Sequence, residues 1–258
     1  DILVQPKGTE LAAVIRLCRK YDVPYQVIGN GSNLLVGDRG IRGLVIEMLS
    51  KEDEICVEDD CITVGAGMLL SKTANRAAEH GLTGMEFAAG IPGRIGGAVV
   101  MNAGAYGGEM KDILTAVTVL DQEGNEKILS AEELELGYRT SCILKKGYIV
   151  TGAKIKLKHG EETAIRARME KQPLEYPSAG STFKRPEGYF AGKLIMDAGL
   201  RGYLVGEAQV SEKHCGFVIN RGNATAADVR TLMQNVADIV EEKFGVRLEP
   251  EVKMIGEF

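Results

Sequence analysis

GIPGRIGGAVVMNAGAYGG, residues 90–108, is the stretch of this sequence that says most about its fold. Seven of its 19 residues are glycine, and Arg94 carries its single charge. A surface linker would be polar, whereas this stretch is apolar and built from small residues. Glycine lets the backbone adopt positive φ and approach a ligand closely. The stretch therefore predicts backbone lying against a flat, largely apolar ligand with a pyrophosphate, and a tightly packed glycine corner is the alternative.

A second glycine loop, GNGSN at residues 29–33, follows a predicted strand. Its two glycines allow several backbone N–H groups to face one anion, and Ser32 and Asn33 add side-chain donors. A polar hairpin loop is the alternative. A third loop, residues 65–67, lies between a predicted strand and a predicted helix, but Leu70 stands where a dinucleotide-binding Rossmann fingerprint needs its third glycine. A plain strand-to-helix turn is favoured there.

Length and composition limit the class of protein. The chain has 258 residues, 45% hydrophobic and 26% charged, which suits one large globular domain or two of ordinary size. There are 31 Lys and Arg against 36 Asp and Glu, and a net charge of −5 argues against a general nucleic-acid binder. No apolar run of about 18 residues indicates a membrane span, and no signal peptide is visible. Five cysteines without a CxxC pair and three histidines without zinc-ligand spacing favour reduced thiols in a cytoplasm and no metal site.

Hydrophobic periodicity predicts helices and strands mixed without a regular βαβ rhythm, and hence an α+β fold. Helices are predicted from Thr9 to about Tyr21, over 69–80, 161–172 and 192–198, and from Thr225 to Gly245. Strands are predicted over 25–28, 34–36, 44–46, 61–64, 115–120, 127–129, 148–158 and 248–255. A short capped helix is expected at 130–133, and Thr225 with Asp228 forms a capping-box pattern. The composition changes beyond Pro173, where Pro177 and Pro186 flank a loop rich in Gly and Ser. This change places a domain boundary within 160–175.

Five blocks of the sequence point together to one enzyme family: GNGSNLLV (29–36), AGIPGRIGGAVVMNAGAYGGE (89–109), GYRTS (137–141), PSAGSTFKRP (177–186) and LEPEV (248–252). In order and spacing the chain resembles the UDP-N-acetylenolpyruvoylglucosamine reductases (MurB). The first two blocks are shared with a wider superfamily of FAD enzymes related to p-cresol methylhydroxylase, whereas the last three are specific to the reductases. The short run from Arg139 to Ser181 resembles the second type of the family, which lacks an insertion that covers substrate in the first type.

The resemblance implies a cytoplasmic, NADPH-dependent flavoprotein oxidoreductase of peptidoglycan synthesis, and so a role in cell-wall biogenesis, cell shape, cell division and the cell cycle. FAD would take hydride from NADPH and pass it to the enolpyruvyl C=C bond of UDP-N-acetylglucosamine enolpyruvate, giving UDP-N-acetylmuramate. The implied partner is this small UDP-sugar. No nucleic acid and no membrane are implied, and the chain is expected to be a monomer.

The family fold implies an FAD-binding region of two α+β subdomains and a C-terminal α+β substrate-binding domain. The expected limits are 1–165 for the FAD-binding region, split near residue 50, then 166–247 for the substrate-binding domain. Residues 248–258 are expected to form a final strand that returns to the FAD-binding region. The family usually begins with a segment containing Thr-Phe-Arg/Lys-x-Gly-Gly, which helps to hold FAD. That segment would end just before Asp1, so a native N-terminal segment is expected to be missing from this chain.

Three catalytic residues follow from the resemblance. Arg139 and Glu251 match the groups that stabilise the enolate, and Ser181 matches the proton donor. A guanidinium stays protonated and can fork onto a carboxylate. Serine can donate a proton only where the acceptor is a very basic carbanion and the hydroxyl is already aimed. Glu249 shares a strand face with Glu251 and is the alternative glutamate.

The expected cofactor contacts lie in the two glycine-rich loops: Gly29, Asn30, Gly31, Ser32, Asn33, Gly90, Ile91, Pro92, Gly93, Gly96, Gly97, Asn102, Ala103, Gly104, Ala105 and Tyr106. The expected substrate contacts are Tyr138, Lys184, Arg185 and Asn220. His214 is expected to be a hydrogen-bonded structural residue rather than a base. Arg94 stands where the family commonly has Ser or Thr, and it could reach a phosphate or point outward.

Two other functions stay open at this point. One is another FAD oxidase or dehydrogenase of the same superfamily, acting on an alcohol or phenol. Covalent flavin attachment in that class often uses His or Tyr near the glycine loop, and no His occurs in 81–158. The other is a non-catalytic nucleotide-binding relative, against which the presence of Arg139, Ser181 and Glu251 counts.

Overall fold

The structure is a computed structural model that describes residues 2–8, 10–50, 55–170 and 181–258. The chain forms two compact units. The first comprises Asp1–Asn30 and Gly43–Glu175, and the second comprises Gly31–Arg42 and Tyr176–Phe258. The second unit is thus discontinuous in sequence. The division into an FAD-binding region, a substrate-binding domain and a returning strand stays a prediction.

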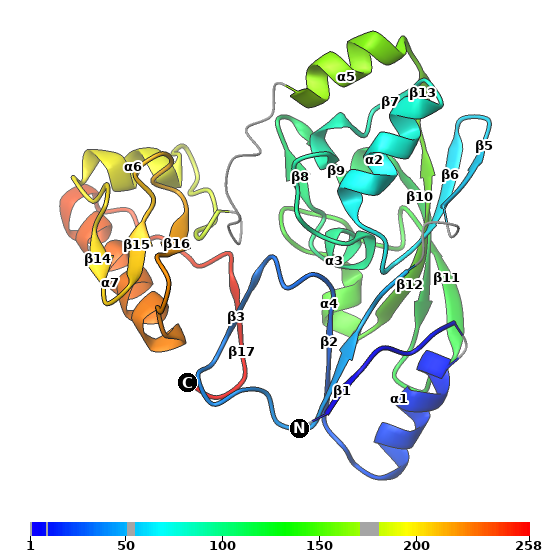
Figure 1. Cartoon of the computed structure of the whole chain (residues 1–258), viewed down its shortest axis with the longest axis horizontal. Helices are drawn as coiled ribbons and strands as arrows, with labels where there is room; N and C mark the ends of the chain where they lie inside the picture. Colours follow the sequence, from blue (N-terminus) through cyan, green and yellow to red (C-terminus); the bar gives the residue numbers. More distant parts are fainter. Residues whose placement is uncertain (1, 9, 51–54, 171–180) are drawn as a thin grey trace. The chain divides into compact units, whose positions relative to one another are not determined.

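A small parallel sheet opens the first unit (Figure 1). Its strands lie in the order β1 (Ile2–Val4), β4 (Leu44–Glu47) and β2 (Tyr25–Ile28). Helix α1 (Glu10–Lys20) packs on it, because Leu11 and Ile15 are four residues apart and share one face of the helix. That face meets the buried Ile46 of β4, which gives this part of the unit its own hydrophobic cluster.

A larger antiparallel sheet forms the body of the first unit. Its strand order is β11 (Glu126–Ser130), β10 (Leu114–Leu120), β12 (Ile149–Lys156), β6 (Cys61–Gly65) and β5 (Ile55–Glu58). Helices α2 (Leu70–Glu79) and α3 (Ile95–Val100) lie beside it (Figure 1). Side chains alternate along β12, where Ala153 and Ile155 are buried and Lys154 is exposed. The largest core cluster joins this buried face to the two helices.

Shorter elements complete the first unit. They are β7 (Leu82–Thr83), η2 (Glu86–Ala88), β8 (Gly104–Ala105), β9 (Gly108–Glu109), η3 (Met110–Asp112), α4 (Cys142–Lys146), β13 (Lys158–His159) and α5 (Glu162–Glu170). Strands β8 and β9 pair as a hairpin, and β13 pairs with β7. The β8–β9 hairpin covers the end of the glycine-rich stretch of residues 90–108 and extends to Glu109, so this end is held by backbone pairing.

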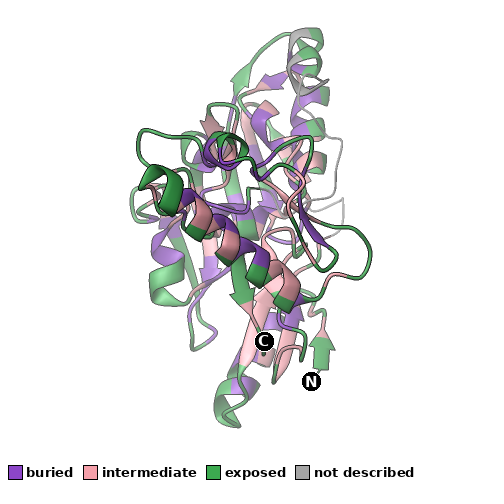
Figure 2. Cartoon of the chain, turned by 90° about the vertical axis from the view of Figure 1, so that its left-hand side faces the viewer, coloured by how far each residue is buried: buried purple, intermediate pink, exposed green. Residues whose placement is uncertain are grey.

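The second unit has an antiparallel sheet in the order β14 (Leu204–Val205), β15 (Ala208–Val210) and β16 (Val218–Asn220). Helices α6 (Ala191–Asp197) and α7 (Ala226–Phe244) share a core with it. Helix α7 begins at the predicted Thr225–Asp228 capping box and ends at the left-handed Gly245. Buried and exposed segments alternate along the helices (Figure 2), as an amphipathic pattern requires.

Several contacts hold residues 31–42 in the second unit. Strand β3 (Leu34–Val36) pairs in parallel with β17 (Lys253–Ile255). Asp38 accepts hydrogen bonds from the backbone N–H groups of Ala226 (2.6 Å) and Ala227 (3.0 Å), which lack partners in the first turn of α7. Arg42 pairs with Glu257 at 3.0 Å. The final strand of the chain therefore returns to an N-terminal segment that belongs to the second unit.

Several local predictions are corrected. Residues 131–135 form turns instead of a short helix, although Ser130 and Glu133 exchange the capping-box hydrogen bonds (2.8 and 3.3 Å). The left-handed φ of Glu135 prevents the turn from continuing as a helix. The strand predicted over 148–158 is interrupted at Leu157, whose N–H donates to the Asp60 carbonyl. The cap predicted at Thr9 lies outside the described residues.

The strand predicted over 248–255 is likewise shorter, at Lys253–Ile255. Pro250 cannot donate a backbone hydrogen bond, and it forms an isolated bridge with Phe183. The strands predicted over 25–28 and 34–36 and the capped helix from Thr225 are confirmed.

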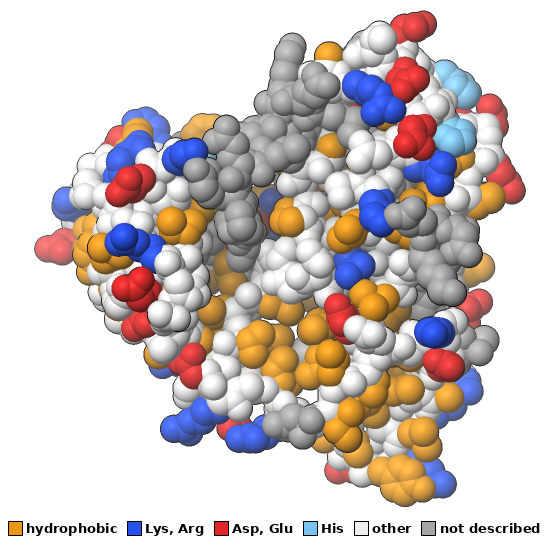
Figure 3. All heavy atoms as spheres, viewed as in Figure 1, with side chains coloured by type: hydrophobic (Ala, Val, Ile, Leu, Met, Phe, Trp, Pro, Cys, Tyr) orange, Lys and Arg blue, Asp and Glu red, His pale blue; other side chains and the backbone are white. Residues whose placement is uncertain are grey.

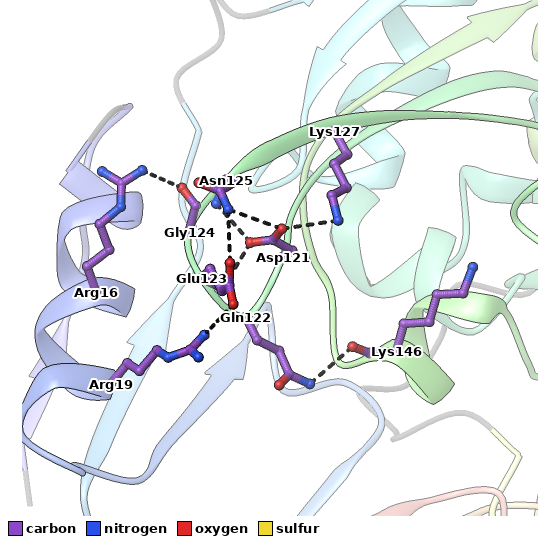
Figure 4. A network of polar contacts seen from close by, with 9 residues as sticks. All are labelled: Arg16, Arg19, Asp121, Gln122, Glu123, Gly124, Asn125, Lys127 and Lys146. Atoms are coloured by element: carbon purple, nitrogen blue, oxygen red, sulfur yellow. Dashed lines mark hydrogen bonds and ion pairs between the residues drawn. The ribbon is translucent and has the colours of Figure 1, made fainter.

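A polar network ties α1 to the hairpin between β10 and β11 (Figure 4). The largely buried Asp121 accepts from the N–H groups of Asn125 and Glu123 (2.9 Å each) and pairs with Lys127 at 3.1 Å. From α1, Arg16 donates to the Gly124 carbonyl at 2.8 Å. The hydrogen bond from the Asn125 backbone, followed by the Lys127 ammonium, lowers the pKa of Asp121 to about 2.

Asp121→Asn should lower the free energy of unfolding at neutral pH, since an amide cannot replace these charge-assisted hydrogen bonds. A carboxyl group whose pKa is lower in the folded state stabilises the fold above its unfolded pKa and loses that stabilisation as pH falls through its folded pKa. The difference in urea midpoint between wild type and variant should therefore be full above about pH 5 and should shrink between about pH 4 and pH 2. A difference that is independent of pH would contradict the assignment.

The matched control is Glu123→Gln in the same hairpin. Glu123 pairs with Arg19 at 3.2 Å, and both side chains are more than half exposed. Exposed pairs contribute about 0–1 kcal/mol, so this variant should shift the urea midpoint little at any pH.

Candidate functional site

Arg139, the predicted catalytic arginine, lies in a tight turn of the first unit. Gly137 and Thr140 exchange two backbone hydrogen bonds (3.1 and 3.3 Å), and Arg139 between them has a φ of 54°. A type II turn needs positive φ at this position, which usually holds Gly or Asn. An L-residue in the left-handed region costs about 1–2 kcal/mol, so the surrounding contacts must hold this turn.

The Arg139 side chain is half-buried against the neighbouring loop. Its Nη1 donates to the Asn102 carbonyl at 3.5 Å, and its Nη2 donates to the Gly104 carbonyl at 3.4 Å. Its guanidinium lies 5.2 Å from the centroid of the exposed Tyr138 ring. The strained backbone and these contacts place a permanent positive charge beside the β8–β9 hairpin.

Asn102 supports this hairpin from inside. It is 0% exposed and has a φ of 43°. Its Nδ2 donates to Glu109 Oε2 (2.8 Å) and to the Gly137 carbonyl (3.1 Å), while its Oδ1 accepts from Lys111 N (2.9 Å). The side chain of Asn102 thus joins the glycine-rich stretch to the Arg139 turn, and its contact with the cofactor stays a prediction.

Asn30, at the start of the first glycine loop, and the two other glycine loops contact one another in the first unit. Asn30 Nδ2 donates to the Pro92 carbonyl at 2.7 Å, which joins the first loop to the second. Leu70 N donates to the Gly93 carbonyl (3.0 Å), and Gly96 N donates to the Ala66 carbonyl (2.8 Å). The 65–67 loop is therefore the plain strand-to-helix turn that the sequence favours, and it also supports the 90–97 segment.

Two adjacent glycines at the start of α3 differ in their surroundings. A Cβ atom on Gly96 would lie 3.1 Å from Ala66 Cβ, so close packing accounts for this glycine. A Cβ atom on Gly97 would meet no described atom within 4 Å. Glycine inside a helix is less favourable than alanine by about 1 kcal/mol. Contacts within the described residues therefore give no reason for glycine at 97, whereas close approach of a ligand does.

Arg94 crosses between the same loops. Its Nη1 donates to the Gly67 carbonyl at 2.6 Å, and its aliphatic part lies near Gly29. Its Nε is buried and has no hydrogen-bond partner among the described residues. Because an unsatisfied buried donor is unfavourable, an acceptor on a bound anion would stabilise this arrangement.

The other predicted cofactor contacts belong to both units, with Gly31 to Asn33 in the second and Gly90 to Tyr106 in the first. Gly31 and Gly107 have positive φ, and a Cβ on either would meet no described atom within 4 Å. Tyr106 is exposed with a φ of 52°. Residues that are half-buried are Ser32, Asn33, Gly90, Ile91, Ala103, Gly104 and Ala105.

In the second unit, Glu251 is held between two segments that are distant in sequence. Its N–H donates to the Thr182 carbonyl at 2.8 Å, and its carbonyl accepts from Asn33 Nδ2 at 3.3 Å. Lys253 N donates to the Asn33 carbonyl at 3.0 Å. Ser181 precedes Thr182 directly and is exposed. Two predicted catalytic residues, Ser181 and Glu251, are therefore brought together with the end of the GNGSN loop.

The two candidate glutamates have different environments. Glu249 is exposed, and its ion pair with Lys184 at 2.8 Å lowers the pKa of Glu249. Glu251 is 8% exposed. The structure thus distinguishes the buried Glu251 from Glu249, whose carboxylate is engaged at the surface. Of the predicted basic substrate contacts, Lys184 holds Glu249 and Arg185 lies 4.0 Å from the Phe190 ring centroid.

Asn220 and His214 both organise local backbone. Asn220 Oδ1 accepts from Gly222 N (2.8 Å) and Ala224 N (3.0 Å). His214 Nδ1 accepts from Gly216 N at 3.2 Å, and its ring lies 4.5 Å from that of Phe217. These contacts support the structural role predicted for His214.

Comparison with known proteins finds two family matches along the chain. Residues 1–130 match the family described as FAD binding domain, and residues 172–255 match the UDP-N-acetylenolpyruvoylglucosamine reductase, C-terminal domain. The chain is 56% identical to the UDP-N-acetylenolpyruvoylglucosamine reductase of Agathobacter rectalis, over 100% of this chain and 88% of the relative. The chain belongs to the UDP-N-acetylenolpyruvoylglucosamine reductase family. A second member of this reductase family, from Lachnoclostridium phytofermentans, is 57% identical over 99% of this chain and 86% of its own length.

A solved structure of the same family has the same fold. The crystal structure of UDP-N-acetylenolpyruvylglucosamine reductase (MurB) from Thermus caldophilus aligns with a TM-score of 0.83 at 40% identity, covering 98% of this chain and 91% of that chain. The predicted α+β fold is thereby confirmed, and so is the resemblance to the reductase family. This family consists of oxidoreductases.

The charge on the surface and the character of the helices bear on possible partners. Lys and Arg side chains are interspersed with Asp and Glu over the face shown in Figure 3. Within the described parts of the chain, none of the helices combines the length and the apolar character that crossing a membrane requires.

Sequence reasoning missed the residues that support the predicted catalytic groups. These are Glu109 and Ser141 beside Arg139, and Thr182 beside Ser181. The only signal in the sequence was their position inside or next to the motif blocks. Nothing in their local pattern shows which hydroxyl or carboxylate points inward.

Thr182→Val should destabilise the second unit. Thr182 is 3% exposed, and its Oγ1 accepts from the backbone N–H of Val218 at 3.0 Å. Valine would leave that buried donor unsatisfied, which costs about 1–3 kcal/mol. Ser181→Ala is the matched control, because this neighbouring hydroxyl residue is exposed and should change unfolding free energy by less than about 0.5 kcal/mol. Equal losses for the two variants in urea titration would argue against the contact.

Proposed function

We propose that this chain is an FAD-dependent reductase that uses NADPH to reduce UDP-N-acetylglucosamine enolpyruvate to UDP-N-acetylmuramate, in the cytoplasm and as a monomer. Membership of the reductase family supports the reaction. The observation in this structure that carries the proposal is the hydrogen bonding of the Ser181 and Glu251 segments in one site. Its place would be peptidoglycan precursor synthesis.

The glycine loops of the first unit fit FAD. The Asn30 side chain joins two of the loops through its hydrogen bond to the Pro92 carbonyl, and Gly97 leaves room for close approach. The buried Nε of Arg94 has no acceptor among the residues that the structure describes. Bound flavin supplies hydride transfer between NADPH and substrate. The residues proposed to hold it are Gly29 to Asn33, Gly90 to Gly93, Gly96, Gly97 and Asn102 to Tyr106.

Arg139 is proposed to stabilise negative charge. Hydride addition to one alkene carbon of the enolpyruvyl group leaves an enolate-like anion, delocalised onto the adjacent carboxylate. A guanidinium can hold both oxygens of that carboxylate and cannot give up its proton. The left-handed turn at Arg139 presents the guanidinium beside the hairpin without need for rearrangement during reaction.

Ser181 and Glu251 are proposed to complete the reduction. The Ser181 hydroxyl gives its proton to the second alkene carbon. The buried Glu251 is proposed to act with Arg139 on the enolate, as a carboxyl group that donates a hydrogen bond to it. Ser181 is exposed at the start of the segment that is bonded to Glu251, so its hydroxyl is accessible to substrate. Tyr138, Lys184, Arg185 and Asn220 are proposed to contact the rest of the substrate, the two cations near its diphosphate.

Gly97→Ala should weaken FAD binding while leaving the apoprotein as stable as wild type or more so. The new methyl group meets no described atom and alanine favours the helix, but it would occupy the space proposed for the cofactor. FAD affinity, measured by fluorescence titration of the apoprotein, should fall roughly tenfold, about 1.4 kcal/mol. Gly96→Ala is the control that should instead lower thermal stability, since its methyl group would press on Ala66. Unchanged FAD affinity in Gly97→Ala would remove this residue from the cofactor site.

Ser181→Ala should separate the two half-reactions of the FAD-loaded chain. Anaerobic NADPH should bleach the flavin at the wild-type rate, because no proton passes from Ser181 in that step. Reoxidation by UDP-N-acetylglucosamine enolpyruvate should slow by roughly 10²-fold or more, the range of a lost general acid. The visible flavin spectrum records both steps, and reoxidation at the wild-type rate would exclude Ser181 as the donor.

A further inference from the structure

The Arg139 turn is fixed on both sides to the end of α3. On one side, Asn102 Nδ2 donates to the Gly137 carbonyl at 3.1 Å. On the other side, the Ser141 hydroxyl, on a residue that is 0% exposed, donates to the Val100 carbonyl at 2.7 Å. Val100 is the last residue of α3, where carbonyl groups lack partners within the helix. The turn is thus held at both ends by buried side chains rather than by its own conformational preference.

Glu109 controls the orientation of one of these side chains. Its Oε2 accepts from Asn102 Nδ2 at 2.8 Å, and the same nitrogen serves Gly137. Lys111 N donates to Asn102 Oδ1 at 2.9 Å. With both ends of the amide engaged, Asn102 cannot rotate without losing three hydrogen bonds. Glu109 itself is held by its capping box with Asp112 and by an ion pair with Lys111.

These contacts matter because Arg139 adopts a conformation that it does not favour. With a φ of 54°, this residue would relax toward negative φ if either end of the turn were released. Such relaxation would move the guanidinium away from the Asn102 and Gly104 carbonyls, which its nitrogens reach at 3.5 and 3.4 Å. Displacement of a catalytic group by about 1 Å can slow a reaction roughly 10²-fold.

We propose that Ser141 and the Glu109–Asn102 pair are positioning residues, which keep Arg139 in its left-handed turn so that its guanidinium meets the enolate of the substrate. This rests on the proposed function, in which Arg139 stabilises that enolate. None of the three side chains needs to touch the substrate. Their effect passes through the backbone of residues 137–140.

The test uses the two half-reactions of the FAD-loaded chain. Ser141→Ala and Glu109→Ala should slow flavin reoxidation by UDP-N-acetylglucosamine enolpyruvate roughly tenfold to 100-fold. In Ser141→Ala, FAD affinity and flavin reduction by NADPH should stay within about twofold of wild type, since Arg139 has no proposed part in either. Glu109→Gln keeps an oxygen that can accept from Asn102 Nδ2 and should restore most of the rate that Glu109→Ala loses.

A control and a double-mutant cycle separate positioning from general destabilisation. Thr73→Val removes another fully buried hydroxyl, which donates to the Leu69 carbonyl in α2, and it should leave both half-reactions unchanged. In an Arg139→Ala background, Ser141→Ala should cause no further slowing, because the group that it positions is already gone.

Three outcomes would overturn the inference. One is an equal slowing by Ser141→Ala with and without Arg139, and another is an equal slowing of both half-reactions. The third is the failure of Glu109→Gln to restore the rate, which also decides the matter if Ser141→Ala does not fold. A wild-type flavin that the enolpyruvyl substrate cannot reoxidise would instead overturn the proposed function, and the inference with it.

Discussion

The backbone of Glu251 is the point at which the second unit is assembled. Thr182 accepts from its N–H, and Asn33 donates to its carbonyl. Through these bonds the start of the C-terminal half, the end of an N-terminal loop and the final strand are held in one place. Strand β17 continues this arrangement by pairing with β3, and Asp38 secures the same N-terminal segment to α7. Loss of the Glu251 contacts would therefore affect both the fold of this unit and its proposed chemistry.

In the first unit, the Arg139 guanidinium is held in a fixed position beside glycine-rich backbone. Glycine gives a ligand close access but adds no rigidity of its own. Rigidity comes from the buried Asn102, which lies inside the glycine-rich stretch and bonds across to Gly137. The glycine residues and the buried amide thus have complementary roles, one set leaving room for a ligand and the other fixing the loop around it. Arg139 is held by the same arrangement.

The hydrogen bonds of a capping box can form at a site where no helix follows. Ser130 and Glu133 make both capping-box bonds, yet the chain turns away at Glu135, whose φ is left-handed. The same pattern at Thr225 and Asp228 begins a helix of 19 residues. The difference is that α7 has an apolar face to bury against the sheet, including Leu232 and Val236. A capping signal predicts a helix only when a periodic apolar face follows it.

The sequence by itself determined the α+β class, most strand and helix positions, the family, and the motif blocks that contain the candidate catalytic residues. These depend on local periodicity, on turn residues and on motif order, all of which can be read along the chain. Only the tertiary structure showed that Glu251 is buried while Glu249 pairs with Lys184, and that Gly96 is packed while Gly97 is open. It also showed that Asn102 and Ser141 clamp the Arg139 turn. Burial and long-range hydrogen bonds depend on which distant segments meet, and the spacing of residues along the chain does not specify that.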